Sequence, residues 1–488
     1  MPGREVLTVE QTRAADKAAI AAGTPGLELM LRAGRAVARE IAARWTPRPV
    51  LVMCGPGANG GDGYVAAKTL QDGGWPVRVA GLVQPSALKG DAAMAADEWA
   101  GPVENLGGKV FEGAGLIVDA LFGAGLDRTL EARVQSVIRA AERSGAPIVS
   151  IDLPSGLSGD LGKPLGHAPQ AALTVTFHRK KLAHVLTPGR DLCGEIVVAD
   201  IGLSAPHDAA LHENDPMLWA DRLNWPTAAT HKHVRGGLIV VSGEAASTGA
   251  ARLAARAGLR IGAGLVTVLT PPDALLVNGA HLEAVMLRPF ETDLEIEEAA
   301  AAADAAVIGP AAGVNETTVS NLFALARTGA GLVIDADALT AFRDDPAELF
   351  QVLDRDDVLT PHPGEFERVF KDLLAASPER VTAARKAAAR AGAVVVLKGS
   401  DTVIAAPDGR AVVNGNGSPW LATAGSGDVL AGFIGGLIAQ GLESFDAACA
   451  AVWIHAEAAA GFGPGLISED LPGLAPAVLR RLYETRRR

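Results

Sequence analysis

The sequence predicts an α/β protein built from two separate parallel sheets, each covered by helices on both faces. In both halves of the 488-residue chain, short apolar runs alternate with helical stretches, a pattern typical of parallel strands buried on both faces. A proline-containing stretch separates the halves, and no internal repeat relates them. Since a domain spans roughly 100–200 residues, we expect one domain over residues 1–215, a linker over 216–229 and a second domain over 230–488.

The first domain is expected to open with helices and to continue as a parallel sheet. An amphipathic region over about residues 8–45 is typical of a helix and is broken near Gly23 and Gly26. Two later helices are expected over 64–72 and 132–144. The expected strands cover residues 50–54, 77–81, 116–120, 148–151, 173–177 and 196–199.

The second domain is expected to follow a connector and to end its sheet with a hairpin. Residues 204–230 contain Pro206, Pro216 and Pro226, and two tryptophans there are expected to be exposed. Asp408-Gly409 is a strong turn signal between two apolar runs. The expected parallel strands cover residues 238–241, 265–269, 306–308, 332–334, 358–359 and 394–397.

Composition excludes several classes of function. A net charge of −12 argues against a surface that neutralises many phosphates, so no nucleic-acid partner is expected. No apolar run approaches the ~20 residues of a membrane span, and the start lacks a secretory pattern, so we expect a cytoplasmic protein without a membrane partner. Cys54, Cys193 and Cys449 show no paired spacing, which argues against disulfides and zinc. Cys54 is expected to be buried at a strand end.

A glycine-rich loop follows the first expected strand. Gly55, Gly57 and Gly60 form a Gly-x-Gly-x-x-Gly pattern, which by itself is only a weak indication of a dinucleotide-binding fold. That fold also needs an acidic residue at the end of its second strand. This chain has Gln84 there, so a plain dehydrogenase is disfavoured.

Two interpretations of this loop stay open. Close packing at a tight turn would by itself forbid side chains and demand glycine. Alternatively, the exposed N–H groups of the following helix bind an anion such as a pyrophosphate, with Asn59 and Asp62 beside it. Asp62 could instead serve only as the N-terminal cap of that helix.

Polar residues also follow two later strands. Asp119 ends the third expected strand before a glycine turn, and Asp152 and Ser155 follow the fourth. In an open parallel sheet, ligands bind outside the carboxyl ends of the strands. We therefore expect Asn59, Asp119, Asp152 and Ser155 to converge on one crevice.

Together these segments resemble the NAD(P)H-hydrate epimerases over nearly all of the first domain, including Leu29 to Gly34 in the first helical region. The resemblance implies a Rossmann-like three-layer fold, a K⁺ ion held by Asn59, Asp119 and Ser155, and Asp152 as substrate contact and candidate general base. Ala58 replaces a usual asparagine, which predicts weaker substrate contact and an intact cation site. The implied substrate-binding residues are Ala58, Asn59, Gly60, Gly61, Asp62, Gly123, Ala124, Gly125, Leu126, Asp127, Arg128, Thr129 and Asp152.

A second motif, Gly425-Ser426-Gly427-Asp428, opens an apolar helical stretch. First-turn amides at such a glycine turn can stabilise the charge on a transferring phosphoryl group. The neighbouring carboxylate can accept a proton from an attacking hydroxyl. The alternative is a capped helix packed closely through its glycines. Lys398 to Thr402, and His362 between two prolines, follow other strands and favour a ligand site.

These motifs resemble the ribokinase-like superfamily and, within it, the ADP- or ATP-dependent NAD(P)H-hydrate dehydratases, from about Lys232 onward. The resemblance implies a ribokinase-like α/β domain with Asp428 as catalytic base. It implies a nucleotide site at Lys398, Gly399, Ser400, Asp401, Thr402 and Gly427, and a substrate pocket at Ala250, Gly313, His362 and Asp428.

The predicted function is repair of hydrated nicotinamide cofactors. The first domain would interconvert the R and S hydrates of NADH and NADPH, and the second would dehydrate the S form with ADP, giving AMP and phosphate. The expected small-molecule partners are both hydrates and ADP or ATP, with K⁺ and Mg²⁺ as cofactors, in a homo-oligomer. Two rivals stay open: a vitamin-precursor kinase fused to a nucleotide-binding module, and a first domain that only binds lipoprotein or nucleotide ligands.

Overall fold

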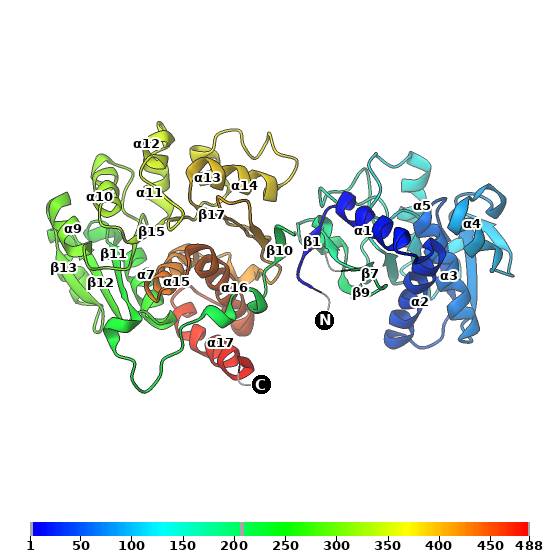
Figure 1. The fold of residues 1–488 in the computed structure, drawn as a ribbon, viewed down its shortest axis with the longest axis horizontal. Coiled ribbons are helices and arrows are strands. Elements are labelled where there is room, and N and C mark those ends of the chain that lie inside the picture. The colour runs from blue at the N-terminus through cyan, green and yellow to red at the C-terminus, as the bar shows by residue number, and fades with distance from the viewer. Residues whose placement is uncertain (1–2, 205–208, 487–488) are drawn as a thin grey trace. The chain divides into compact units, whose positions relative to one another are not determined.

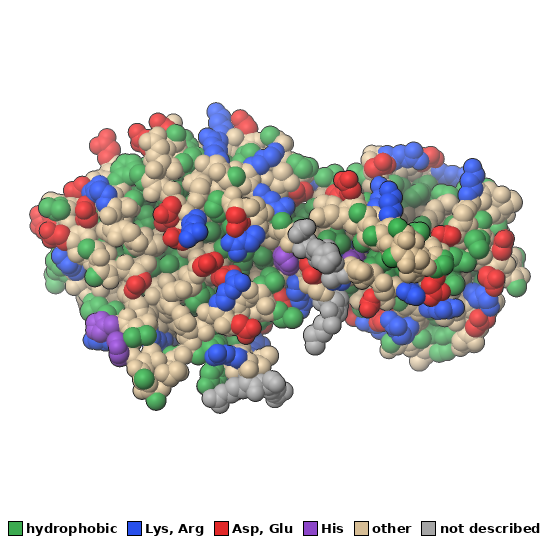
Figure 2. Space-filling view, viewed as in Figure 1, with side chains coloured by type: hydrophobic (Ala, Val, Ile, Leu, Met, Phe, Trp, Pro, Cys, Tyr) green, Lys and Arg blue, Asp and Glu red, His purple; other side chains and the backbone are tan. Residues whose placement is uncertain are grey.

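The computed structural model describes residues 3–204 and 209–486. By its internal contacts the chain divides into two units between His212 and Glu213. Among the described residues, no helix combines the length and apolarity needed to cross a membrane. On the face shown in Figure 2, lysine and arginine side chains are interspersed with acidic ones.

The first unit is built on an all-parallel sheet, which confirms the predicted α/β class. The described residues form seven strands in the order β4-β3-β2-β5-β6-β7-β9. From β2 the chain adds β3 and β4 on one side, and it then adds β5, β6, β7 and β9 on the other side of β2. The strand order therefore reverses between β2 and β5, and the loops after these two strands flank a topological switch point. The bounds are β2 Val50–Cys54, β3 Val77–Gly81, β4 Val103–Asn105, β5 Leu116–Ala120, β6 Ile148–Ile151, β7 Leu173–Phe177 and β9 Glu195–Ala199.

All six predicted strands of this sheet are confirmed, while β4 was missed because it is a short edge strand with no buried residue. Cys54 is buried at the end of β2, as expected. A separate parallel pair, β1 (Val6–Leu7) with β8 (Lys180–Lys181), fixes the start of the chain beside the end of β7.

Helices cover both faces of the first sheet (Figure 1). The predicted break in the first helical region is confirmed, because Gly23 has a φ of +103° and Pro25 precedes the second helix. Met30, Val37 and Ile41 of that helix, spaced to share one helix face, pack with α3 and α4 in one core cluster. Helix α5 packs in another cluster. The bounds are α1 Val9–Ala21, α2 Gly26–Arg44, α3 Ala58–Asp72, α4 Gly90–Asp97, α5 Ala132–Arg143 and α6 Gly189–Leu192.

The second unit contains a larger mixed sheet. Its described strands lie in the order β10-β19-β18-β17-β16-β15-β14-β11-β12-β13. In this spatial order, every neighbouring pair between β17 and β13 is parallel. The predicted hairpin is confirmed as the antiparallel pair β18 and β19. The bounds are β10 Leu211–Glu213, β11 Gly237–Val241, β12 Leu265–Thr270, β13 Met286–Pro289, β14 Ala305–Ile308, β15 Gly331–Ile334, β16 Val358–Leu359, β17 Val394–Leu397, β18 Val403–Ala405 and β19 Ala411–Val413.

Helices α7, α15, α16 and α17 share the main core of the second unit with its sheet, and α9 to α14 lie on the other side in Figure 1. Helices α7 and α15 pack through glycine: a Cβ at Gly432 would lie 2.1 Å from the carbonyl oxygen of Ala254. This contact fixes the position of α15, whose first turn carries the second motif. The bounds are α7 Thr248–Ile261, α8 Leu275–Gly279, α9 Asp293–Ala300, α10 Glu316–Ala326, α11 Ala336–Ala341, α12 Pro346–Phe350, α13 Pro363–Val369, α14 Arg380–Ala391, α15 Ser426–Ala439, α16 Ser444–Phe462 and α17 Leu471–Arg486.

The prediction of exposed tryptophans in the connector is wrong. Trp219 is 1% exposed, and its indole N–H donates to Asn214 Oδ1 at 3.1 Å. Trp225 packs against Tyr483 with ring centroids 5.1 Å apart. Short 3-10 turns fold this segment onto the core of the second unit, which also contains Leu223. Pro206 lies outside the described residues.

Candidate active sites

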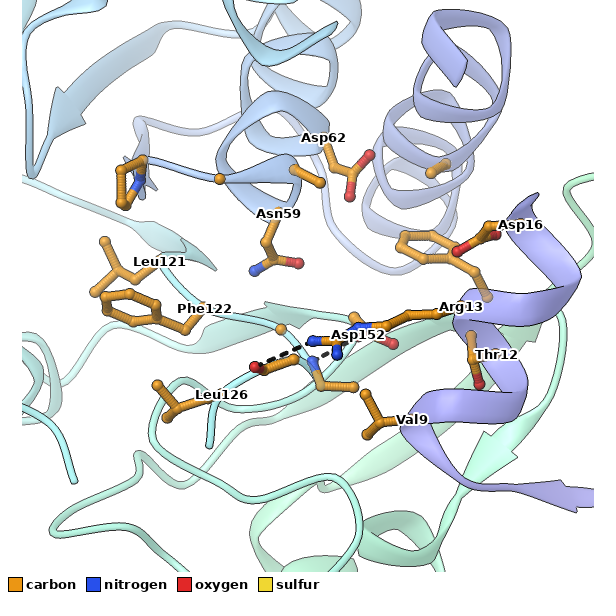
Figure 3. A pocket seen from close by; sticks show the side chains of 18 of the residues that line it. Val9, Thr12, Arg13, Asp16, Asn59, Asp62, Leu121, Phe122, Leu126 and Asp152 are labelled. Carbon is orange, nitrogen blue, oxygen red and sulfur yellow. Dashed lines mark hydrogen bonds between the residues drawn. The ribbon is translucent and has the colours of Figure 1, made fainter. Parts of the chain in front are cut away.

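A cavity of about 880 Å³ opens where the parallel strands of the first unit end. The loops after β2, β5 and β6 contribute to it, as the strand-end argument predicts (Figure 3). Gly60 and Gly61 are among the predicted substrate residues but are buried behind the cavity lining. The predicted residues that line the cavity are Ala58, Asn59, Asp62, Gly123, Ala124, Gly125, Leu126, Asp127, Arg128, Thr129 and Asp152.

The packing interpretation of the glycine loop holds at Gly55, and the anion-binding interpretation stays open at Gly57. A Cβ at Gly55 would lie 1.8 Å from the carbonyl oxygen of Leu121, so packing alone requires glycine there. Gly57 instead has no described atom within 4 Å of an added Cβ and lines the cavity. Helix α3 begins immediately afterwards, at Ala58, without a side-chain cap. Its first N–H groups are therefore available to an anion.

Asp62 is not the cap of this helix, so that interpretation is wrong. It is the fifth residue of α3, whose N-cap is Gly57. Its side chain lines the cavity. Burial raises its pKa well above the usual range, and the charges of Asp152 and Asp16 add to the effect.

Asp119 and Ser155 form a tightly bonded buried group beneath the cavity. Asp119 is 0% exposed. Its carboxylate accepts from the Ser155 hydroxyl at 2.6 Å and from the Ser155 N–H at 2.8 Å. The Ser155 hydroxyl lies 3.2 Å from the carbonyl oxygen of Phe122 and accepts from that residue's N–H at 2.9 Å. Burial raises the pKa of Asp119, although the hydrogen bonds from Ser155 and Leu121 oppose the rise.

Asp152 is held by a buried lysine that the sequence did not single out. Lys181, 1% exposed, donates to Asp152 Oδ1 at 2.7 Å and to Thr176 Oγ1 at 2.8 Å. Burial opposes ionisation of Asp152, but the charge and hydrogen bond of Lys181 outweigh burial and lower its pKa to about 2. Asp152 also has a φ of +66°, a strained backbone for a non-glycine residue that tends to occur at functional sites. Lys181 lies in β8, the two-residue strand that comes after β7, where no local sequence pattern indicates it.

Helix α1 forms one wall of the cavity and was also missed. Val9, Thr12, Arg13 and Asp16 of this helix line it. Figure 3 shows Val9 and Arg13 extending toward the loop that contains Leu126. The N–H of Val9 donates to Asp160 Oδ1 at 2.8 Å. Strand β1 comes directly before this helix, and its Leu7 pairs with Lys181 of β8. This pairing places the start of α1 next to Lys181.

The second site lies at the first turn of α15, and its turn is accessible. Gly425 has a φ of +88° and caps the helix without a side-chain hydrogen bond. The Ser468 hydroxyl donates to the carbonyl oxygen of Ala424 at 2.6 Å and supports the turn. Gly425 to Asp428 are all partly exposed. The first N–H groups of α15 can therefore meet a phosphate group.

Lys398 and Asp428 converge at this turn with a carboxylate that was not predicted. Lys398 Nζ donates to Asp335 Oδ1 at 2.7 Å and lies 3.8 Å from Glu365 Oε2. A Cβ at Gly427 would lie 3.5 Å from Lys398 Nζ. Burial, and next the charge of Asp335, raise the pKa of Asp428 to about 6, while Lys398 opposes the rise. Asp335 directly follows β15, so its position at a strand end could have marked it as a candidate site residue.

The remaining predicted substrate residues lie on three different elements. His362 caps α13, its Nδ1 accepting from the N–H of Gly364 at 2.9 Å, and its side chain is 52% exposed. The N–H of Gly313 donates to Asp337 Oδ2 at 3.0 Å. Ala250 lies in the first turn of α7 and is partly exposed.

The predicted nucleotide loop, residues 398–402, is closed by its own hydrogen bonds. Thr402 Oγ1 accepts from the N–H of Gly399 at 3.1 Å and donates to its carbonyl oxygen at 2.8 Å. Ser400 is exposed. Asp401 is 2% exposed and lies 3.5 Å from Arg380 Nη1, so its carboxylate supports the loop from inside.

A cavity at the carboxyl ends of a parallel sheet, together with an accessible glycine turn at a helix start in a second α/β unit, is typical of an enzyme with two candidate sites. A family model described as NAD(P)H-hydrate dehydratase matches residues 238–464, and one described as YjeF-related protein N-terminus matches residues 26–183. A solved ribokinase-like superfamily protein from Enterococcus faecalis, 23% identical, has a TM-score of 0.52 over 57% of this chain and 99% of that chain. At that identity the likeness shows the fold alone.

Similar proteins extend over nearly the whole chain. A bifunctional NAD(P)H-hydrate repair enzyme of Moorella thermoacetica is 36% identical over 94% of this chain and 93% of its own length. One of Coxiella burnetii is 35% identical over 94% of this chain and 96% of its own length. The chain belongs to the family of bifunctional NAD(P)H-hydrate repair enzymes.

Proposed function

We propose that the first unit interconverts the R and S hydrates of NADH and NADPH, and that the second returns the S hydrate to the reduced cofactor with ADP, giving AMP and phosphate. The observation that carries the proposal is that two separate sites stand on one chain of this family: the cavity of the first unit and the Gly425–Asp428 turn of the second. Hydration yields both epimers, so repair of the whole pool needs both activities.

The proposed dehydration uses the nucleotide to improve a poor leaving group. Asp428 accepts the proton of the hydrate's hydroxyl as the hydroxyl oxygen attacks the terminal phosphorus of ADP, and AMP leaves with the bonding electrons. The C–O bond then breaks and phosphate takes its electron pair. The adjacent ring carbon gives a proton to water, which restores the double bond. The first-turn amides of α15 stabilise the charge on the transferring group, and Lys398 lies beside Gly427 to contact it.

We assign the K⁺ site to Asn59, Asp119 and Ser155, because the chemistry of the donors fits. The group offers a buried carboxylate, a hydroxyl and the Phe122 carbonyl, the oxygen ligands that hard cations prefer. Asn59 Nδ2 is buried without a hydrogen-bond partner among the described atoms, and Figure 3 shows it on the side of Leu121 and Phe122. A half turn of this amide presents its oxygen there instead. The bound cation would supply positive charge next to Asp119.

We expect Mg²⁺ to arrive with the nucleotide. Mg²⁺ is usually held by one or two carboxylates together with substrate phosphates. Within residues 3–204 and 209–486, no three or more His, Cys, Asp or Glu side chains form a group that could hold a metal ion. The cytoplasmic location and the homo-oligomer stay predictions.

The proposed division of labour is tested by closing the cavity. A Cβ at Gly123 would lie 2.9 Å from Asp152 Oδ2 and 3.0 Å from Asn59 Oδ1, so Gly123→Val should exclude substrate from the first site. We expect turnover of pure R hydrate with ADP to fall to the rate of uncatalysed epimer interconversion, measured as the return of reduced-nicotinamide absorbance. Turnover of the S hydrate should stay at the wild-type rate.

The matched control is Gly107→Val, because an added Cβ at Gly107 meets no described atom within 4 Å. It should turn over both epimers like the wild type. Unchanged R turnover in Gly123→Val would contradict the assignment of epimerisation to this cavity.

A further inference from the structure

Three carboxylates of the first cavity differ in what they contact. Asp152 is saturated: Oδ1 accepts from Lys181 at 2.7 Å and from Thr176 at 3.0 Å, and Oδ2 accepts from the N–H of Ala124 at 2.8 Å. With a pKa of about 2, it is a weak proton acceptor near neutral pH. These contacts suit a residue that holds the Ala124 loop and Lys181 in place. Proton transfer is better assigned to another group.

Asp62 and Asp16 have no such contacts. Neither carboxylate has a hydrogen bond or ion pair to another side chain or backbone group within the described parts of the chain, although both line the cavity. They come from separate elements, Asp62 from α3 and Asp16 from α1. In Figure 3 both project into the space above Asp152.

We propose that Asp62 and Asp16 are the acid–base pair of the epimerisation, with Asp152 and Lys181 as positioning residues. The inference rests on the proposal that this cavity is the epimerase site. It goes beyond that proposal by naming the groups that move protons.

The chemistry of the hydrate requires two such groups. Water adds to an N–C=C unit at the carbon bonded to nitrogen, so the hydroxyl-bearing carbon lies next to the ring nitrogen. Asp62 gives its proton to the hydroxyl, the C–O bond breaks, water leaves with the electron pair, and the nitrogen lone pair forms a C=N bond. A water molecule then adds to the opposite face and gives a proton to Asp16, while the C=N electrons return to nitrogen. In this proposal each carboxyl serves one face of the ring. The reverse reaction exchanges their roles, and between turnovers in the same direction the proton returns from Asp16 to Asp62 through water.

Electrostatics favours one proton on this pair. Burial, followed by the charges of Asp152 and Asp16, raises the pKa of Asp62 well above the usual range. Burial also raises the pKa of Asp16, but the charge of Lys181 opposes that rise. Asp62 is therefore the carboxyl that carries the proton more readily and Asp16 the one that is more readily ionised, as in other enzyme pairs whose environments separate the two pKa values.

The first test replaces each carboxyl separately in the full-length chain. Asp62→Asn and Asp16→Asn should each lower the kcat of epimer interconversion by about 10²- to 10⁴-fold, the usual contribution of one acid or base, with little change in KM. The double variant should be little worse than either, because the two act as a unit. Asp72→Asn, an exposed carboxyl near the end of the same helix, should match the wild type, and turnover of the S hydrate should be unchanged in every variant.

A second test follows the hydroxyl oxygen. Because dehydration transfers that oxygen to phosphate, R hydrate processed in H₂¹⁸O by the wild type should yield ¹⁸O-labelled phosphate, whereas S hydrate processed by Gly123→Val should yield unlabelled phosphate. Mass spectrometry of the phosphate measures both.

The inference is overturned if either asparagine variant keeps its kcat, if only KM rises, or if phosphate from the R hydrate carries no label. Failure of the underlying epimerase assignment looks different. In that case Gly123→Val, which fills the cavity without changing either carboxyl, would itself leave R turnover intact.

Discussion

Asp428→Asn will abolish dehydration and leave epimerisation at the wild-type rate. The amide introduced by this substitution cannot accept the proton of the attacking hydroxyl, and loss of one general base costs about 10²- to 10⁴-fold in rate. Asparagine is close in size to aspartate, and Asp428 is only partly buried, so the turn should keep its shape. Recovery of reduced-nicotinamide absorbance from S hydrate and ADP measures dehydration. Chromatographic separation of the epimers measures their interconversion.

The pH profile gives a second check on the same residue. Only ionised Asp428 can accept a proton, and its pKa of about 6 predicts that wild-type kcat for dehydration declines as pH falls through about 6. Asp221→Asn, an exposed carboxyl of the second unit, should keep both the rate and the inflection. Retained dehydration in Asp428→Asn would remove this residue as the base.

Lys181→Met will destabilise the first unit by about 3–5 kcal/mol, because it leaves the ionised Asp152 without its buried partner. The pair is 2.7 Å apart, with side chains 2% and 16% exposed. Hydrogen exchange of the β6 and β7 amides measures the loss in this unit alone, since local opening energies differ between parts of a structure. Epimerisation should be lost as well.

Removing the charge of Asp152 as well distinguishes the electrostatic contribution of the Lys181–Asp152 pair from the contribution of its packing. Lys181→Met combined with Asp152→Asn should recover part of the stability, because no buried charge remains unpaired. Lys163→Met, at an exposed lysine of the same unit, should exchange like the wild type. Protection of β6 and β7 that survives in Lys181→Met would show that Asp152 does not depend on this lysine.

The sheets were predictable because buried parallel strands are continuous apolar runs. Asn59 and Asp152 could be predicted to line one cavity because parallel strands deliver their carboxyl ends to one edge of the sheet. Lys181 and Asp16 were missed for the opposite reason. Their meeting depends on the pairing of Leu7 with Lys181, a long-range contact between two-residue strands that no local pattern indicates.

Packing also decided what local patterns left ambiguous. The sequence could not tell whether Asp62 caps α3 or faces a ligand, since that depends on where the helix begins. Trp219 lies in a connector with several prolines and mixed charge and was expected to be exposed. Its ring instead packs edge-on against Trp453 with centroids 5.8 Å apart. Such burial is set by the partner surface, which lies far away in the chain.

The most direct test of two independent active sites mixes two variants, each of which is inactive at one site. Gly123→Val and Asp428→Asn should each fail to convert R hydrate to reduced cofactor with ADP beyond the uncatalysed rate of epimer interconversion or of dehydration. Mixed in equal amounts, they should restore turnover of the R hydrate, because one supplies the S epimer and the other dehydrates it. Failure of the mixture, with each chain folded and active in its remaining half-reaction, would contradict two independent sites that share a released intermediate.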